Sequence, residues 1–207
     1  MSTGKEARFV VAPERMPEIP AAKMTEAQKQ AVAEISAGPR GEVKGPFVAF
    51  LRSPELMRRV QKVGEYLRFM CPIDKRLGEF AAIIGARAWS QQFEWWAHYR
   101  QAVAAGLKRE IADAVAEGRR PAGMAEDEEI LYDFLTELIN TKGVSDTTYA
   151  RAVAKFGEQG VIDLTSVVGY YTLLAMVMNV ARTAVPEGPS LPLPALPLRA
   201  TPLVTRD

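Results

Sequence analysis

Apolar side chains recur at spacings of three and four residues through most of the chain between residues 25 and 185. This period matches the 3.6-residue turn of an α-helix, so it predicts a series of amphipathic helices. We find no stretch with the strict apolar–polar alternation of a half-buried strand. The predicted fold is therefore all-α, a bundle of seven to eight helices. The predicted helices cover residues 26–37, 54–70, 74–88, 90–106, 108–116, 126–141, 145–156 and 161–183.

Capping residues set several of the predicted boundaries. Thr25 can cap the first helix, and Gln28 stands three residues later in a capping-box arrangement. Ser53 and Pro54 form a second helix start, with serine as the cap and proline at the first helical position. Ser145 is expected to cap the helix over 145–156.

The apolar stripes predict which helix faces are buried, and glycines predict where helices end. The glycines Gly157 and Gly160 are expected to break the chain between the last two helices. In the helix after Ser53, the residues at spacings of three and four are Leu56, Val60, Val63, Leu67 and Met70. We expect that stripe to face the core.

Residues 164–181 carry no charged side chain, which makes this segment a transmembrane candidate by length alone. Polar residues interrupt it, among them Thr165, Thr172 and Asn179, and no cluster of lysine and arginine flanks it. A helix that is apolar all round can also lie at the centre of a bundle or at a subunit interface. We therefore interpret it as a buried helix, with no membrane partner.

The two ends of the chain differ in composition from the middle. Residues 1–24 are rich in proline and are expected to form an extended N-terminal arm, before a helical domain over residues 25–185. Residues 186–207 form a tail rich in proline and leucine. Its leucines favour packing along its own or a neighbouring subunit. A disordered tail, or a peptide ligand for a proline-binding module, remains an alternative.

Composition narrows the class of protein. Of the 207 residues, 48% are hydrophobic and 25% are charged, as in soluble globular proteins. The net charge of +1 gives no electrostatic case for a nucleic-acid partner or an anionic membrane. The single cysteine, Cys71, excludes an intrachain disulfide, and the N-terminus has no apolar run of signal-peptide length. A cytoplasmic protein is expected.

One helical face carries candidate chemistry. Gln91, Glu94 and His98 fall on the same side of the predicted helix, with Trp95 beside them, while Phe93, Trp96 and Arg100 are expected to point to the other side. A carboxylate at Glu94 could bind the only histidine and fix its tautomer, as in a general acid–base pair. The alternative is a satisfied polar pair on an aromatic core helix.

Other kinds of site find little support. One histidine and one cysteine cannot build a typical zinc site, so we predict no metal. The sequence has no glycine-rich phosphate loop and no nucleophile elbow. An acid–base enzyme acting on a small carboxylated or cyclic substrate is expected to need no organic cofactor.

A resemblance to a known family is carried by residues 76–115, which read RLGEFAAIIGARAWSQQFEWWAHYRQAVAAGLKREIADAV. This segment resembles the carboxymuconolactone decarboxylase and AhpD-like superfamily. The matching elements are Arg76 with Glu79, Phe93-Glu94-Trp95 with His98, and Ala102 to Leu107. Similarity extends over about residues 40–185, through Tyr66-Leu67-Arg68-Phe69 and Gly169-Tyr170-Tyr171 with Asn179.

The resemblance implies a fold, an assembly and a set of site residues. The fold is an AhpD-like helical bundle that forms homotrimers or homohexamers. The peroxidase branch places cysteines where this chain has Gln91 and Glu94, so the resemblance favours the cysteine-free branch, which removes CO2 from carboxylated lactones without a cofactor. The catalytic residues are then His98, held by Glu94 or Glu79. Substrate-binding candidates are Gln91, Arg87 as a carboxylate clamp, and Trp95 and Tyr99 as walls.

Two alternatives remain beside an acid–base enzyme with a small-molecule substrate. The first is an AhpD-like antioxidant protein that uses a partner thiol, with Cys71 as its only support. The second is a non-catalytic oligomeric relative that acts as an interaction scaffold through the apolar segment 164–181 and the tail.

Overall fold

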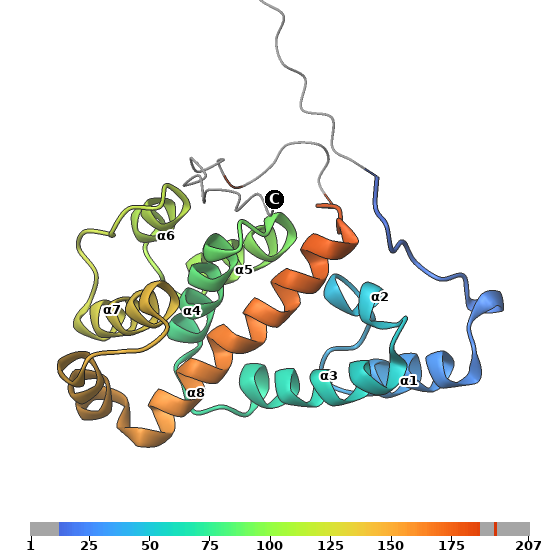
Figure 1. Cartoon of the computed structure of the whole chain (residues 1–207), viewed down its shortest axis with the longest axis horizontal. Helices are drawn as coiled ribbons and strands as arrows, with labels where there is room; N and C mark the ends of the chain where they lie inside the picture. The colour runs from blue at the N-terminus through green and yellow to red at the C-terminus, as the bar shows by residue number, and fades with distance from the viewer. Residues whose placement is uncertain (1–12, 187–192, 194–207) are drawn as a thin grey trace, which may run out of the picture.

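The computed structural model describes residues 13–186 and 193, and in this part of the chain every regular element is helical (Figure 1). This confirms the predicted all-α fold. The elements are a 3₁₀-helix η1 (Ala21–Lys23) and eight α-helices: α1 (Glu26–Ala37), α2 (Pro46–Phe50), α3 (Pro54–Phe69), α4 (Lys75–Ala88), α5 (Gln92–Ala104), α6 (Arg109–Ala116), α7 (Glu126–Thr141) and α8 (Asp146–Ala181).

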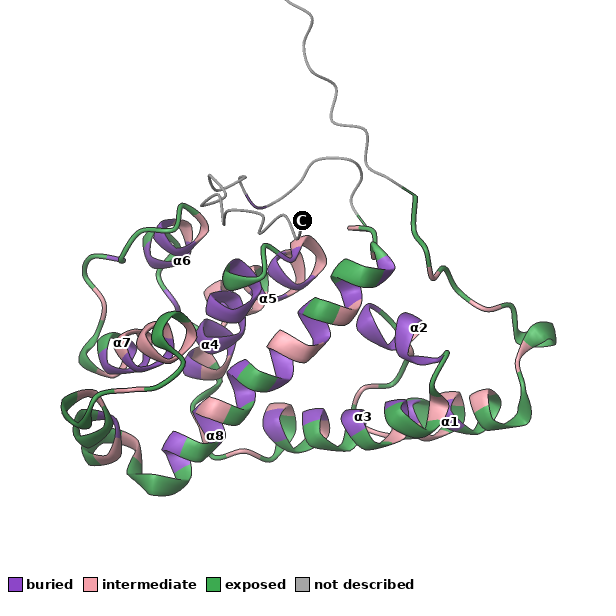
Figure 2. Ribbon diagram, viewed as in Figure 1, coloured by how far each residue is buried: buried purple, intermediate pink, exposed green. Residues whose placement is uncertain are grey.

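Helix α4 lies at the centre of the bundle. It packs against α5, α6, α7 and the long helix α8, which runs diagonally across the molecule (Figure 1). On the other side of α8, α1 and α3 pack against each other. Most of α4 is buried (Figure 2). Its buried side chains are mainly small or apolar, among them Phe80, Ala81, Ala82, Ile83 and Ala86. Any polar side chain on α4 that faces inward is therefore held in a rigid, largely dry setting.

Several predicted boundaries agree with the structure. Thr25 and Gln28 form the expected capping box at the start of α1, and the Ser145 side chain accepts a hydrogen bond from the backbone N–H of Thr148. Ser53 occupies the N-cap position of α3 and Pro54 the first turn, as predicted, but the Ser53 side chain makes no capping hydrogen bond.

The predicted break in α8 is confirmed at one glycine and wrong at the other. Gly157 has φ 70° and ψ 170°, a conformation outside the helical region that divides α8 into two parts. Gly160 lies within the second part. A Cβ there would come within 2.6 Å of the Phe156 Cβ, so its glycine serves close packing rather than a break.

Helix α2 was missed, because its five residues are too few to show a helical period. Pro46 fits its first turn, and Phe47 and Phe50 are buried.

The buried face of α3 differs from the predicted stripe. Leu56, Val63 and Met70 are exposed by 46%, 51% and 66% of their surfaces. Val60 and Leu67 of the predicted stripe are buried, and the rest of the inward face is Met57, Gln61 and Gly64. Apolar residues stand on two neighbouring faces of this helix, so spacing alone could not choose between them. The predicted homo-oligomer, which would cover exposed apolar side chains, stays a prediction.

Within the described residues, α8 is the one helix long and apolar enough to cross a membrane. Inside the molecule, 56% of its most apolar window is buried, and α8 as a whole packs chiefly against α4 and α7. Burial in the bundle therefore accounts for much of its apolar composition.

The N-terminal arm and the tail are described only in part. Arg15 N–H donates to the carbonyl oxygen of Ala181 over 2.8 Å, so the arm lies against the end of α8. Leu193 is buried, and its backbone exchanges hydrogen bonds with the Gln92 side chain over 2.8 and 3.3 Å. The other tail residues after Pro186 lie outside the described part, as does the arm before residue 13.

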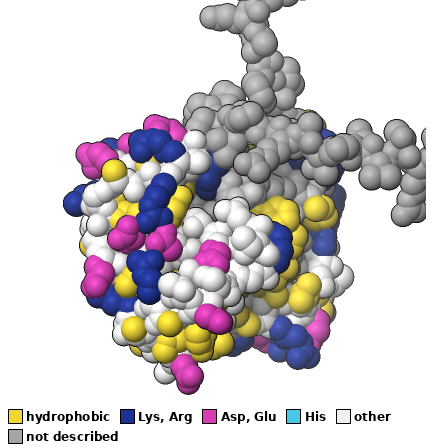
Figure 3. Space-filling model, turned by 60° about the vertical axis from the view of Figure 1, so that its left-hand side comes forward, with side chains coloured by type: hydrophobic (Ala, Val, Ile, Leu, Met, Phe, Trp, Pro, Cys, Tyr) yellow, Lys and Arg dark blue, Asp and Glu magenta, His cyan; other side chains and the backbone are white. Residues whose placement is uncertain are grey.

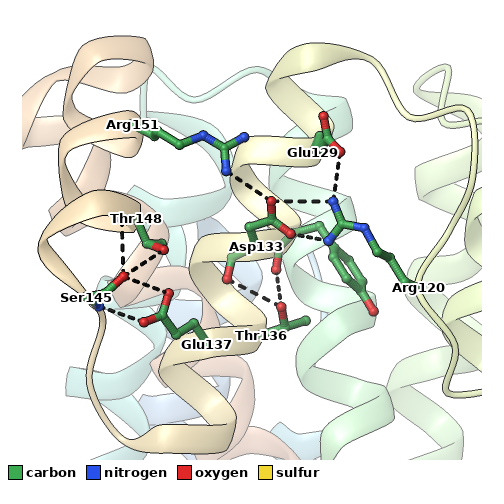
Figure 4. Close-up of polar contacts among 9 residues, drawn as sticks. Arg120, Glu129, Asp133, Thr136, Glu137, Ser145, Thr148 and Arg151 are labelled. Carbon is green, nitrogen blue, oxygen red and sulfur yellow. Dashed lines mark hydrogen bonds and ion pairs between the residues drawn. The ribbon is translucent and has the colours of Figure 1, made fainter.

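A polar network joins α7 to the start of α8 (Figure 4). Arg120 and Arg151 approach the Asp133 carboxylate from opposite sides, and the Arg151 contact measures 3.2 Å. Glu137 accepts a hydrogen bond of 2.6 Å from the backbone N–H of Ser145. Figure 3 turns the left-hand side of the Figure 1 view forward, and basic and acidic side chains are interspersed on the face that it shows. These contacts hold α7 against the start of α8, and both helices pack against α4.

Candidate functional site

The only histidine is paired with a glutamate from another helix. Nδ1 of His98, on α5, lies 2.6 Å from Oε2 of Glu79, on α4, and both side chains are buried. A carboxylate accepts but does not donate, so an ionised Glu79 places a proton on Nδ1. The second ring nitrogen, Nε2, is then available for proton transfer.

The predicted Glu94–His98 hydrogen bond does not form. Both carboxyl oxygens of Glu94 are buried without a hydrogen-bond partner, and Glu79 occupies Nδ1 of His98 instead. Burial raises the pKa of Glu94 well above its ordinary value. Glu94 is thus a carboxyl group that the protein environment favours in its neutral form.

The stability of the protein is expected to report on Glu94. Because the folded-state pKa is raised, the folded chain holds this proton more tightly than the unfolded chain. That contribution is fully present below the ordinary value of 4.5 and is lost as pH rises through the folded-state pKa. Urea unfolding should show wild type losing stability relative to Glu94→Gln as pH rises from about 4.5. A pH-independent difference would contradict the assignment.

Gln91 ties α5 to α8. Its side-chain oxygen accepts a hydrogen bond of 2.8 Å from the backbone N–H of Glu94, so it caps α5. Its amide nitrogen donates to Asn179 over 3.3 Å, and Asn179 donates in turn to the carbonyl oxygen of Trp89 over 3.0 Å. These contacts orient the start of the helix that carries His98.

His98 lines a cavity of about 500 Å³ between α5, α8 and the segment that leads into α2. Aromatic side chains form much of its wall: Phe47, Phe93, Trp96, Tyr170 and Tyr171. The edge of the Tyr171 ring meets the His98 ring, with 4.6 Å between centroids. The volume suits a small organic molecule.

The same cavity carries positive charge. Arg40, Lys44, Arg68 and Arg100 line it, and the described lining residues include no aspartate or glutamate. Lys44 is paired with Glu42 over 2.6 Å, and the Arg100 guanidinium lies over the Trp96 ring at 5.3 Å. A cavity lined in this way favours an anionic ligand.

None of the four predicted substrate-binding residues, Gln91, Arg87, Trp95 and Tyr99, lines this cavity. Arg87 donates to the carbonyl oxygen of Ala116 over 3.3 Å and to Ser90 Oγ over 3.2 Å, beside a separate, smaller pocket. Trp95 is buried against Tyr99, and the Tyr99 hydroxyl donates to Asp113 over 2.8 Å. Arg87, the predicted carboxylate clamp, is therefore not among the cations that line the cavity.

The cavity residues that were missed include two that were expected on the opposite side of the helix. Phe93 and Trp96 share a face with Arg100, and this face meets the cavity with His98 at its edge. The predicted site lay on the face of α5 that carries Gln91, Glu94 and His98, whereas the cavity meets mainly the neighbouring face. The family-like motifs 66–69 and 169–171 contain Arg68, Tyr170 and Tyr171, which was the available signal.

Cys71 follows α3 and is not among the residues that line the His98 cavity. Burial raises the pKa of its thiol above the ordinary value, and the nearby Asp163 carboxylate acts in the same direction. Both effects disfavour the reactive thiolate.

Comparison with known proteins places the fold. No protein-family model matches the chain, and no curated protein matches it. A structure from Ralstonia eutropha, described as an AhpD core and an uncharacterized peroxidase-related protein, aligns with a TM-score of 0.70 at 16% identity, covering 84% of this chain and 93% of that one. A protein of unknown function from Agrobacterium tumefaciens, named as a candidate antioxidant defence protein AhpD, aligns with a TM-score of 0.61 at 16% identity, covering 67% and 96%. The chain therefore has the AhpD-like helical fold.

Proposed function

We propose that the protein is a cofactor-independent acid–base enzyme of the carboxymuconolactone decarboxylase type, acting on a small carboxylated or lactone substrate. The observation that carries the proposal is the buried His98–Glu79 pair at the wall of a cavity lined by four cations. The cavity also weighs against a purely scaffolding role, since a scaffold has no need of a histidine at the wall of a cavity lined by cations.

The proposed chemistry is a decarboxylation or a related lyase or hydrolase step. In decarboxylation, the bond from carbon to the carboxylate breaks and CO2 leaves. The electron pair passes into the conjugated carbonyl of the lactone as an enolate. Protonated His98 delivers its Nε2 proton to carbon, and water restores that proton afterwards. Glu79 stabilises the imidazolium through Nδ1, and the cations offset charge on the substrate and the enolate.

A thiol-dependent antioxidant activity is the second candidate, since one of the two similar structures described above is named as an antioxidant defence protein and the other as peroxidase-related. The residues give it less support. Gln91 and Glu94 stand at the spacing of the expected cysteines, and the Cys71 thiolate is disfavoured.

One pair of assays separates the two candidates. The purified full chain should release CO2 from members of a panel of carboxylated γ-lactones, and Cys71→Ser should retain that rate. Hydroperoxide reduction with a dithiol donor should stay at background. Hydroperoxide reduction that Cys71→Ser abolishes, together with no turnover of the panel, would replace the proposed function with the second candidate.

A further inference from the structure

Arg40 and Arg68 supply positive charge that the described residues of the cavity do not neutralise. Arg40 Nη2 donates to the Tyr170 hydroxyl over 3.2 Å, and Arg68 Nη2 donates to the Gln101 side-chain oxygen over 3.2 Å. Both partners are neutral, unlike the Glu42 carboxylate beside Lys44. Arg40 and Arg68 are both half-buried, and guanidinium groups taken partly out of water are stabilised by a carboxylate beside them. The ion-pair partner of this cavity is therefore expected to be its ligand.

Arg40 is held in a fixed position. Its guanidinium lies over the Phe47 ring, 4.6 Å from the centroid, while Tyr170 fixes Nη2. Its Nε is buried and has no hydrogen-bond partner. The Nε1 of Trp96, another residue of the same cavity, is also buried without one. Two orphaned N–H donors at one cavity call for an acceptor from outside the chain.

Gly64 of α3 provides the space for this arrangement. A Cβ at this position would lie 2.0 Å from the Tyr170 hydroxyl oxygen and 2.6 Å from Arg40 Nη2. Both distances are far below van der Waals contact, and Tyr170 is a buried, rigid ring. Gly64 is helical, where alanine is otherwise the more stable residue. Its lack of a side chain is thus explained by the Arg40–Tyr170 contact.

We infer that Arg40 is the specificity-determining residue of the cavity, positioned by Tyr170 and Phe47 and given room by Gly64, and that its guanidinium binds the carboxylate of a flat ligand. This inference rests on the site of the proposed function and deepens it, because it names the residue that selects the ligand. The aromatic walls suit a planar body, and the guanidinium suits a carboxylate.

A matched pair of probes tests the inference. Benzoate and benzamide have the same flat shape and differ in charge. His98 is the only histidine in the sequence and lines the cavity, so its imidazole NMR signal reports binding of either probe. Wild type should bind benzoate more tightly than benzamide by about 10- to 100-fold, the value of a charge-assisted hydrogen bond.

The variants separate charge from position. Arg40→Gln should erase the preference for benzoate. Gly64→Ala should weaken it at least about tenfold although every charge remains, because the new Cβ displaces Arg40 and Tyr170. Arg59→Gln, which removes an exposed cation paired with Glu55 on the outer face of α3, should retain the preference. Circular dichroism checks that each variant is folded, and Arg40→Lys, which keeps the charge but lacks the planar guanidinium, should recover only part of the preference.

The inference is overturned if either Arg40→Gln or Gly64→Ala keeps the wild-type preference, or if wild type binds both probes alike. These outcomes differ from failure of the proposed function. An Arg40-dependent preference for benzoate without any His98-dependent turnover would sink the proposed function alone. His98-dependent turnover of a lactone, with benzoate and benzamide bound equally, would sink this inference alone.

Discussion

Replacing His98 with glutamine is expected to lower kcat for decarboxylation of the substrate by about 10²- to 10⁴-fold, the usual contribution of a positioned general acid. Nε2 of His98 is the proton donor in the proposed step, and glutamine occupies similar space without a group that titrates. The measurement is CO2 release under saturating substrate. KM should change little if the anion-binding cations are left in place.

Glu79→Gln is the companion variant. It retains a hydrogen-bond acceptor near Nδ1 but removes the charge that stabilises the imidazolium, so kcat should fall by less than in His98→Gln. Benzoate binding, followed by titration calorimetry because His98→Gln has no histidine signal, serves as the control, since both variants should retain it if the cavity is intact. A His98→Gln protein that is folded and turns over the substrate at the wild-type rate would remove His98 from the mechanism.

Replacing Arg76 with methionine is expected to destabilise the fold by about 3 kcal/mol, the lower end of the range for breaking a buried ion pair. Arg76 binds Glu128, and it also binds Asp127 over 2.7 Å. The Glu128 side chain is 5% exposed and would lose its cation, whereas Arg76 keeps 20% exposure, which moderates the loss. Urea unfolding of the two proteins gives the difference.

Two further variants serve as controls for Arg76. Arg119→Met removes an exposed arginine that pairs with Glu117, and it should cost less than about 1 kcal/mol. Arg76→Met combined with Glu128→Leu removes both charges and should recover much of the lost stability. Equal stability of Arg76→Met and wild type would show that this pair does not hold α4 against α7.

The helices themselves could be predicted from the sequence, because local signals mark them. Thr25 and Gln28 form the capping box that their spacing indicated, and Gly157 adopts the non-helical conformation that glycine permits. Helix α2 escaped notice because five residues are too few to show a period. The inward face of α3 was misjudged because Leu56 and Met57 are both apolar, and only tertiary packing decides between them.

The candidate site could be predicted in part. The residues Glu79 and His98 were named from a family-like motif, and the structure brings them together across two helices. The anion-binding groups could not be found in this way. Arg40 lies in a loop, and it reaches the cavity only because Gly64 and Tyr170, on two other helices, leave and shape the space for it. Arg87 looked suitable by position along the chain, but its helix turns it toward a different pocket.

The central claim is that acid–base turnover takes place in the cavity shared by His98 and Arg40. The most direct test is steady-state CO2 release at increasing benzoate concentration. Competitive inhibition is predicted, with an inhibition constant equal to the dissociation constant measured from the His98 imidazole signal. Turnover that is unchanged at benzoate concentrations that saturate that signal would contradict the claim, because the chemistry would then lie elsewhere.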